Sequence, residues 1–450
     1  MSTTVMLAAA YFSNEIGAEY GVLSQAHYEM VHSCLLKREM KRQLQLPPGH
    51  NILPIAEGGK EAMDLRVAEA TTRTLVAQST LAAVLEFFGA QVAGQLSDRI
   101  GRRPVLMVAS LLMAVCKALP MVRPSIFSVW AAKSGGEALN TICTDALLAG
   151  VSDLFASDIV AYSRLAGRLR ALGGGAWMVG PVIGSKLCTV DHRMPYLFST
   201  LAATSVTVAS LRLPETLSGG NTVGFLTALS SLDPRACLPI GWISMFTRSG
   251  TYKTCGRALP LLALALAMQR LPFYGTYDVQ DGHARTHLGW TSDQMSIYRT
   301  IEGLTDFSQG ALAAFSVSRL GPFWGSLAGN LCSGTAFFLQ AFSRAGSSFV
   351  RRNLMFIGVA LLAVPPEAVT EALLINKSAA SGVGKGKLMA DVSNFTALMK
   401  MCGPLFLGRA YFLGLKHNLP SLWGLMALGM HLTAQLILTF GVGLRPGLIA

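Results

Sequence analysis

The sequence reads Gly94-Gln95-Leu96-Ser97-Asp98-Arg99-Ile100-Gly101-Arg102-Arg103-Pro104 between two long apolar runs. Gly94 has no side chain, which lets a neighbouring helix approach closely. Asp98 falls at the edge of the first apolar run, where a carboxylate can meet an arginine or the N-terminus of a helix. Gly101 permits a sharp turn, and Arg102 and Arg103 are expected to hold the loop on the cytosolic side of a membrane. The stretch therefore predicts a short cytosolic loop between two membrane-spanning helices.

The composition excludes a soluble chain and a disordered one. Of 450 residues, 51% are hydrophobic and 14% are charged, against about 25% charged in an average protein. The mean hydropathy is +0.44. Because one helical span needs about 20 residues, the chain has room for about a dozen spans. We therefore expect an integral, multi-pass membrane protein that has the lipid bilayer as a partner.

The net charge of +12 is spread in short basic runs between the apolar stretches. This distribution is typical of membrane topology signals. The sequence has no basic stripe with interleaved aromatic residues, so we expect no nucleic-acid partner. The eight cysteines include no C-x-x-C pair, so neither a zinc site nor a disulfide framework is indicated. We expect no metal and no cofactor.

Twelve apolar runs predict twelve membrane-spanning helices, near residues 3–27, 72–97, 104–121, 125–150, 169–189, 194–213, 257–275, 292–318, 322–343, 352–375, 389–415 and 420–443. The predicted fold class is an all-α polytopic membrane protein. Two six-helix bundles are expected at 1–213 and 257–450, joined by a cytosolic connection at 214–256, with both termini in the cytosol. Twelve spans leave the basic cluster Lys37–Arg42 of a hydrophilic loop at 34–70 outside, against the usual rule. Whether the first run crosses the membrane therefore stays open.

Two short features recur along the chain. The stretch Ser97–Gly101 has a degenerate echo at Val317–Gly321, and Gly180-Pro181 is matched by Gly403-Pro404. Both pairs are separated by about 220 residues, which indicates an internal duplication of the kind from which transporters are often built. In such proteins the binding site lies between the two repeats.

The stretch at 94–104 resembles the signature loop of the major facilitator superfamily, G-x-L-x-D-R-x-G-R-R, which lies between the second and third helices of those transporters. The resemblance implies a fold of two pseudo-symmetric six-helix bundles. It also implies a conformational latch between the bundles, made by Gly94, Asp98, Arg99, Gly101, Arg102 and Arg103. On this basis we expect Asp98 to meet the end of the helix predicted at 389–415.

Further motifs resemble one branch of this family. The pattern Ala176-x-x-x-Gly180-Pro181-x-x-Gly184 is similar to the G-P-x-x-G pattern of the antiporters, and Gly289-Trp290 resembles the tetracycline-resistance-like branch. Leu213-Pro214-Glu215-Thr216-Leu217 is similar to the family's usual ending of the sixth helix. Small residues at these spacings allow tight helix packing, and proline adds a kink. We expect packing and kink roles for Gly180, Pro181, Gly184, Gly403 and Pro404.

Charged residues in the fourth predicted span form a stripe. Lys133, Glu137, Thr141 and Asp145 follow one another at steps of four, which keeps them near one face of an α-helix. The family often has an arginine in this helix that takes part in proton coupling, and Lys133 is the candidate here. The stripe predicts either a coupling site that lines a cavity or a structural ion pair that docks helices.

Other charges inside predicted spans are candidates for the same cavity. Glu86 lies in the second span, and Arg299, Glu302 and Asp306 share one face of the eighth. Glu367 and Glu371 follow Pro365-Pro366, where we expect the tenth span to leave the membrane. Lys400 lies in the eleventh span, and His431, in the twelfth, is expected to be a packing residue.

The combined features predict a secondary active transporter of a small organic solute that works by alternating access. The resemblance favours efflux, with protons as the candidate coupling ion, and we expect a monomer. Two alternatives stay open: an uptake carrier for a sugar or other nutrient, and a receptor or scaffold on the same fold that no longer transports. No phosphate-binding loop, nucleophile elbow or zinc-protease motif is present, which argues against an enzyme. The residues do not identify the membrane.

Overall fold

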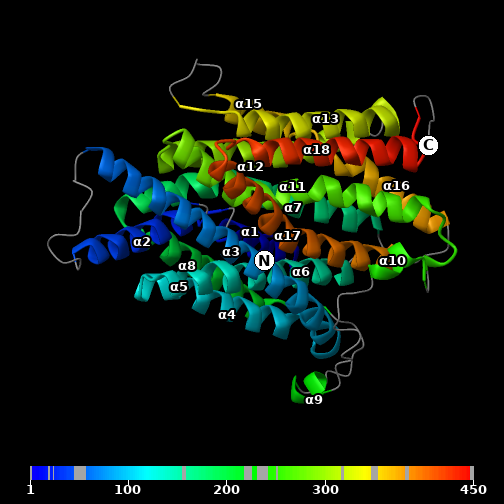
Figure 1. The fold of residues 1–450 in the computed structure, drawn as a ribbon. Coiled ribbons are helices and arrows are strands. Elements are labelled where there is room, and N and C mark those ends of the chain that lie inside the picture. Colours follow the sequence, from blue (N-terminus) through cyan, green and yellow to red (C-terminus); the bar gives the residue numbers. More distant parts are fainter. Residues whose placement is uncertain are drawn as a thin grey trace. The chain divides into compact units, whose positions relative to one another are not determined.

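The protein is helical throughout the part described by its computed structural model, and no strand occurs there (Figure 1). The structure describes residues 3–18, 21–23, 25–44, 57–154, 159–216, 225–230, 242–249, 252–315, 319–345, 353–380 and 385–445. The helices are α1 Thr3–Ile16, α2 Ala26–Leu44, α3 Glu57–Ile100, α4 Arg102–Val122, α5 Ile126–Trp130, α6 Gly136–Leu154, α7 Ile159–Val190, α8 Met194–Arg212, α9 Phe225–Ser230, α10 Ile243–Thr247, α11 Ala258–His287, α12 Ser292–Phe315, α13 Gly321–Ala341, α15 Leu354–Leu361, α16 Glu367–Ala380, α17 Lys385–Lys416 and α18 Leu422–Leu436. The predicted all-α fold class is confirmed.

The helices form two compact units. The first unit contains Met1–Leu85, Leu96–Leu229 and Asp281–Thr300, and the second contains Glu86–Gln95, Ser230–Gln280 and Ile301–Ala450. In the first unit, α4 packs against α6 and α8, and α1 packs against α7 and α8. In the second unit, α13 packs against α15 and α18, which lie beside it in Figure 1. The apolar cores are centred on Met113, Leu147 and Val206 in the first unit and on Leu262, Leu266 and Leu388 in the second.

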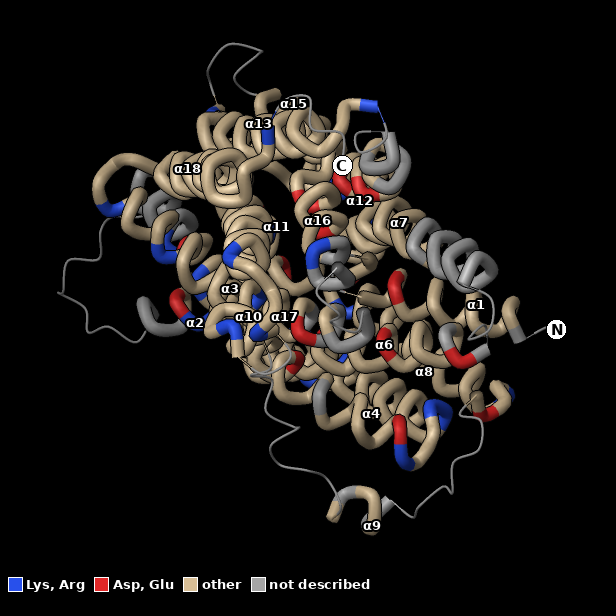
Figure 2. The backbone as a smooth tube through the Cα atoms, turned by 90° about the vertical axis from the view of Figure 1, so that its right-hand side faces the viewer, with Lys and Arg blue, Asp and Glu red and all other residues tan. Residues whose placement is uncertain are grey.

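Lys, Arg, Asp and Glu occur as short segments along the helices, most of which consist of other residues (Figure 2). Five described helices are long and apolar enough to cross a membrane: 66–100, 102–122, 194–212, 258–287 and 422–441. Several of the other predicted spans are interrupted or carry more charge, so they do not reach that threshold. The count of twelve spans remains a prediction.

The first predicted span is interrupted. Helix α1 ends at Ile16 and α2 begins at Ala26. The backbone carbonyl of Gly17, just after α1, accepts hydrogen bonds from Lys117 Nζ at 2.7 Å and from the hydroxyl of Ser199. Side chains of α4 and α8 thus satisfy a carbonyl that the helix itself leaves free.

The segment expected as a hydrophilic loop at 34–70 is helical where it is described. Helix α2 continues to Leu44, and α3 already begins at Glu57. Leucine, lysine, arginine, glutamate and methionine dominate the end of α2, and all of them favour helix. A hydrophilic composition therefore did not mean a loop here.

The fourth and tenth predicted spans also depart from regular helices. The fourth consists of α5, a π-helical turn at Ala131–Gly135, and α6. The tenth is divided into α15 and α16 by Pro365-Pro366. Proline lacks the N–H that a continuous helix needs and restricts the residue before it. Gly329 of α13 packs closely on this break, since a Cβ atom there would lie 2.7 Å from Pro366 Cα.

Candidate functional site

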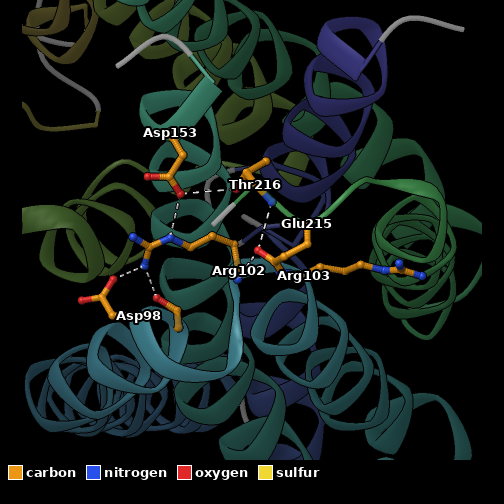
Figure 3. Close-up of polar contacts among 7 residues, drawn as sticks. Asp98, Arg102, Arg103, Asp153, Glu215 and Thr216 are labelled. Carbon is orange, nitrogen blue, oxygen red and sulfur yellow. Dashed lines mark hydrogen bonds and ion pairs between the residues drawn. The ribbon is translucent and has the colours of Figure 1, made fainter. Parts of the chain in front are cut away.

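The loop between α3 and α4 is organised around the guanidinium of Arg102 (Figure 3). Arg102 forms ion pairs with Asp98 at 2.5 Å and with Asp153 of α6 at 3.1 Å. It also donates to the hydroxyl of Ser97 at 2.5 Å. The side chain of Asp98 is 63% exposed. Arg102 therefore connects the end of α3 to α6 within the first unit.

A third carboxylate, that of Glu215, holds the beginning of α4 (Figure 3). Its two oxygens accept from the backbone N–H groups of Arg102 at 2.9 Å and Arg103 at 3.1 Å. An anion at this position satisfies free N–H groups and interacts favourably with the helix dipole. The sequence motif Leu213–Leu217 was noticed only as a family ending, so this role of Glu215 was missed.

Gly101 has the backbone geometry that the loop needs. Its φ of +104° is accessible mainly to glycine, and a Cβ atom there would overlap the Glu215 carboxylate. Arg99 reaches the Ala228 carbonyl at 3.4 Å, and Arg103 reaches the Leu211 carbonyl at 2.6 Å. Both side chains therefore have specific acceptors beyond any general attraction to a membrane surface.

Two expectations for this loop lack structural support. A Cβ atom at Gly94 would have no neighbour within 4 Å, so the described structure gives no packing reason for this glycine. The ion-pair partner of Asp98 is Arg102, which lies one helical turn further along the chain. A contact between Asp98 and the helix predicted at 389–415 stays a prediction.

The second unit contains a group of charged and polar side chains on four helices. We call it the buried charge cluster: Glu86 of α3, Arg270 and Tyr274 of α11, Glu367 and Glu371 of α16, and Thr396 and Lys400 of α17. Lys400 Nζ lies 2.6 Å from Glu86 Oε1, and Glu86 is 10% exposed. The same ammonium lies 5.6 Å from the centre of the Tyr274 ring, within cation–π range.

Arg270 is the other cation of this cluster. Its guanidinium contacts Glu371 and Thr396 directly, and its Nε lies 4.0 Å from Glu367 Oε2. The side chain of Arg270 is 13% exposed. Glu367 and Glu371 face Arg270 because the helix restarts after the proline pair. That the tenth span leaves the membrane there stays a prediction.

Sequence reasoning named Glu86 as a cavity residue but did not single out Arg270. The signal was present, because Arg270 is a full charge inside the apolar run at 257–275.

The first unit buries its own charges. Lys117 of α4 is 2% exposed and donates to Gly17 O. Glu15 of α1 is buried and accepts from Thr144 Oγ1 at 3.0 Å and Trp177 Nε1 at 3.1 Å. Neither Lys117 nor Glu15 was singled out in the sequence, although both are charges in apolar runs.

The stripe expected in the fourth span is divided. Lys133 and Glu137 line a small cavity together with His27, Lys117 and Asn140, whereas Thr141 and Asp145 do not line it. Lys133 is buried and Asp145 is exposed. Each step of four residues turns about 40° around a helix, so the stripe drifts away from the cavity between Glu137 and Asp145.

The face expected in the eighth span is also divided. Arg299 forms a fully buried ion pair with Asp281 of α11 at 2.5 Å. Asp306 accepts a hydrogen bond from Gln309 at 2.9 Å, and Glu302 is partly buried. A second ion pair of the first unit joins Arg285 to Glu29 at 2.8 Å.

The duplicated Gly-Pro pairs lie at close helix contacts in both units. A Cβ at Gly180 would lie 2.6 Å from Gly21 Cα, and Gly184 packs as tightly on Val22. A Cβ at Gly403 would lie 2.9 Å from Gly275 N. Pro181 and Pro404 lie inside helices that continue past them, α7 and α17. Helix α7 thus packs on the break after α1, and α17 packs on α11.

Among the described residues, no group of three or more His, Cys, Asp or Glu side chains could hold a metal ion. The buried polar groups listed above are instead organised as ion pairs and hydrogen bonds between helices. Such intramembrane charges are costly and usually serve a substrate or ion pathway.

Comparisons with known proteins agree with the fold and the loop. A family model for "Sugar (and other) transporter" matches residues 17–144. The chain is 25% identical over 375 residues to the tetracycline resistance protein, class E, of Escherichia coli, a match that covers 80% of this chain and 84% of the relative.

Solved structures share the fold. The human organic anion transporter MFSD10 has 20% identity and a TM-score of 0.65, with 97% of this chain and 100% of that chain covered. The MFS proton:xylose symporter XylE has 15% identity and a TM-score of 0.59, with 98% and 95% covered. The signature loop, the helical fold and these comparisons agree: the chain is similar in sequence and fold to multi-pass membrane transporters of the major facilitator superfamily, which are not enzymes.

Proposed function

We propose that this chain exports a small organic solute in exchange for protons, by alternating access. One observation carries the proposal: the ion pair between Glu86 and Lys400 joins α3 and α17 at 2.6 Å. Burying charges in a membrane-spanning bundle costs free energy. We propose that a polar solute separates this pair and takes the place of one of its charges. The solute would then bind with different affinity in the two states of the cycle, as transport requires.

The proposed direction of transport and the proposed coupling ion rest on the similarity to one relative and on one motif. The relative from Escherichia coli is a tetracycline resistance protein, and the G-P-x-x-G pattern at Gly180–Gly184 is similar to that of antiporters. We propose a monomer in a lipid bilayer, with bundles at 1–213 and 257–450 that rock about the connection at 214–256. The loop at 94–103 would act as the latch.

The test uses purified protein in liposomes with radiolabelled tetracycline or xylose as probes. An antiporter accumulates the probe in liposomes that are acidic inside, because protons leave as the solute enters. We expect accumulation of tetracycline under this gradient and little under the reverse gradient. Liposomes with Glu86→Gln protein should accumulate much less.

A second candidate function is supported by one comparison. The family model that matches residues 17–144 is that of sugar and other transporters. An uptake carrier of this type would accumulate xylose when the outside is acidic. A receptor or scaffold would bind tetracycline or xylose without transporting it. Binding of a probe without flux of either probe would therefore reject both transport proposals.

A further inference from the structure

The break between α15 and α16 is held by side chains of other helices in the second unit. Gln309 of α12 donates to the Leu362 carbonyl at 3.2 Å, and Gln269 of α11 donates to the Pro366 carbonyl at 3.0 Å. The first bond satisfies a carbonyl whose usual helical donor, four residues further on, is Pro366, which has no N–H. The second bond ties the start of α16 to α11. The interruption is therefore a built feature, and it starts α16 at Glu367. Discontinuous helices of this kind carry ion and substrate sites in transporters.

Two carboxylates on α16 share one guanidinium. Glu367 and Glu371 are four residues apart, so they lie on the same face of the helix. Arg270 contacts Glu371 directly, and its Nε lies 4.0 Å from Glu367 Oε2. The two glutamate side chains are 33% and 35% exposed, whereas Arg270 is 13% exposed. One positive charge balances only one of the two carboxylates, and about a third of each glutamate side chain stays exposed.

The other charges near this pair have partners of their own. Lys400 is 2.6 Å from Glu86, and Asp306 accepts from Gln309. Among the described residues, the charged and titratable groups that face the pair are Arg270 and Tyr274 of α11, with Lys400 of α17 and Glu86 of α3 next to them. Within the buried charge cluster, three carboxylates face two cations. Two carboxylates that share one site cannot both ionise without cost, and one proton removes the excess charge.

We propose that Glu367 and Glu371, positioned by Arg270, bind the proton that drives transport. The proposal rests on the proton-coupled function above and assigns its coupling site. The step is simple: one carboxylate takes up a proton from water and becomes a carboxylic acid, and Arg270 stays paired with the other. Loss of the proton on the opposite side of the membrane restores the second charge.

The position of this site explains how proton and solute affect each other. Arg270 and Tyr274 are one turn apart on α11, and Thr396 and Lys400 are one turn apart on α17. Four residues of helix span about 6 Å, so the proton site lies next to the Glu86–Lys400 pair. Arg270 holds Thr396, and a change in the charge that faces Arg270 therefore acts on the same face of α17 that presents Lys400.

Infrared spectroscopy tests proton binding without transport. The purified protein is titrated with acid, and the carbonyl stretch of protonated carboxylic acids is recorded for wild type, Glu367→Gln and Glu371→Gln. Removing either charge leaves one carboxylate for Arg270, so we expect each variant to lack a band that wild type gains. The control is Asp391→Asn, which removes a buried carboxylate of α17 that accepts from Tyr252 at 2.8 Å. The band should persist there, and its persistence in both glutamate variants would overturn the site.

Flux measurements in liposomes separate this proposal from the proposed function. Gradient-driven accumulation of tetracycline should be at least about tenfold lower for Glu371→Gln than for wild type. Coupling free energies between two binding sites typically produce changes of this size. Exchange of tetracycline without a gradient should fall much less. If wild type moves neither tetracycline nor xylose while the infrared band behaves as expected, the proton site stands and the transport function fails. If wild type transports and both glutamate variants respond to the gradient as it does, the proton site is wrong.

Discussion

Glu215 accepts a hydrogen bond from the backbone N–H of Arg102 at 2.9 Å, across 113 residues of sequence. This bond, with the parallel one from Arg103, joins the end of the sixth predicted span to the start of the third. The signature loop is therefore not held by its own residues alone. Its shape depends on the carboxylate of Glu215, which follows α8.

Replacing Glu215 by alanine should destabilise the start of α4. The variant loses acceptors for two backbone N–H groups and a favourable charge at a helix N-terminus. Such caps contribute about 1 kcal/mol, so the thermal unfolding temperature in detergent should fall by a few degrees. Glu69→Ala is the matched control, because Glu69 forms an exposed ion pair with Arg73 on one helix. Equal unfolding temperatures for the two variants would contradict the capping role.

The two glycines of the signature loop should respond differently to alanine. Gly101→Ala meets a φ of +104° and the Glu215 carboxylate, and strain of this kind costs about 1–3 kcal/mol. Gly94→Ala meets no atom within 4 Å, and alanine favours helix by up to about 1 kcal/mol over glycine. Thermal unfolding of the purified variants should therefore fall for Gly101→Ala and stay level or rise for Gly94→Ala. A similar loss for both would show that Gly94 packs closely in the folded protein.

Asp98→Asn should slow turnover while leaving solute affinity within a few-fold of wild type. Asp98 is 63% exposed and pairs with Arg102 in its own loop, and exposed pairs of this type contribute roughly 0–1 kcal/mol to stability. A strong loss of transport with unchanged unfolding would therefore reflect the conformational cycle. Flux and probe binding are measured on the same liposome preparation. Normal turnover at unchanged expression would reject the latch assignment.

Much of the fold could be predicted from the sequence because apolar run length and punctuation are local properties. Pro104 and Gly101 mark where α4 begins, and the apolar runs locate α4, α8 and α11 within a few residues at their starts. The breaks were harder to place, since their causes lie far away in sequence. The end of α1 depends on Lys117 and Ser199, and the Pro365-Pro366 break depends on Gln269 and Gln309.

The site could be predicted only in part for the same reason. A charge inside an apolar run, such as Glu86, indicates that an ion-pair or hydrogen-bond partner is needed. The run does not indicate which residue that partner is. Its partner Lys400 is 314 residues away, and nothing local links the two. Steps of four in the fourth span suggest one face, but of that stripe only Lys133 and Glu137 line the cavity, and two of its other lining residues, His27 and Lys117, are distant in sequence.

The Glu86–Lys400 pair should behave as a coupled unit in a double-mutant cycle. Glu86→Gln leaves an ammonium without its carboxylate, and Lys400→Gln leaves a buried carboxylate without its ammonium. Breaking one partner of a buried pair costs up to about 3–5 kcal/mol, and less here because Lys400 is 31% exposed. The double variant Glu86→Gln/Lys400→Gln removes both charges, so its loss of unfolding free energy should be smaller than the sum of the two single losses by about 1 kcal/mol or more. Its transport should stay low, because the charges that a solute would replace are gone. Additive effects on stability would mean that the two side chains are not coupled at all. Recovery of flux in the double variant would mean that the pair only docks α3 on α17 and does not bind solute.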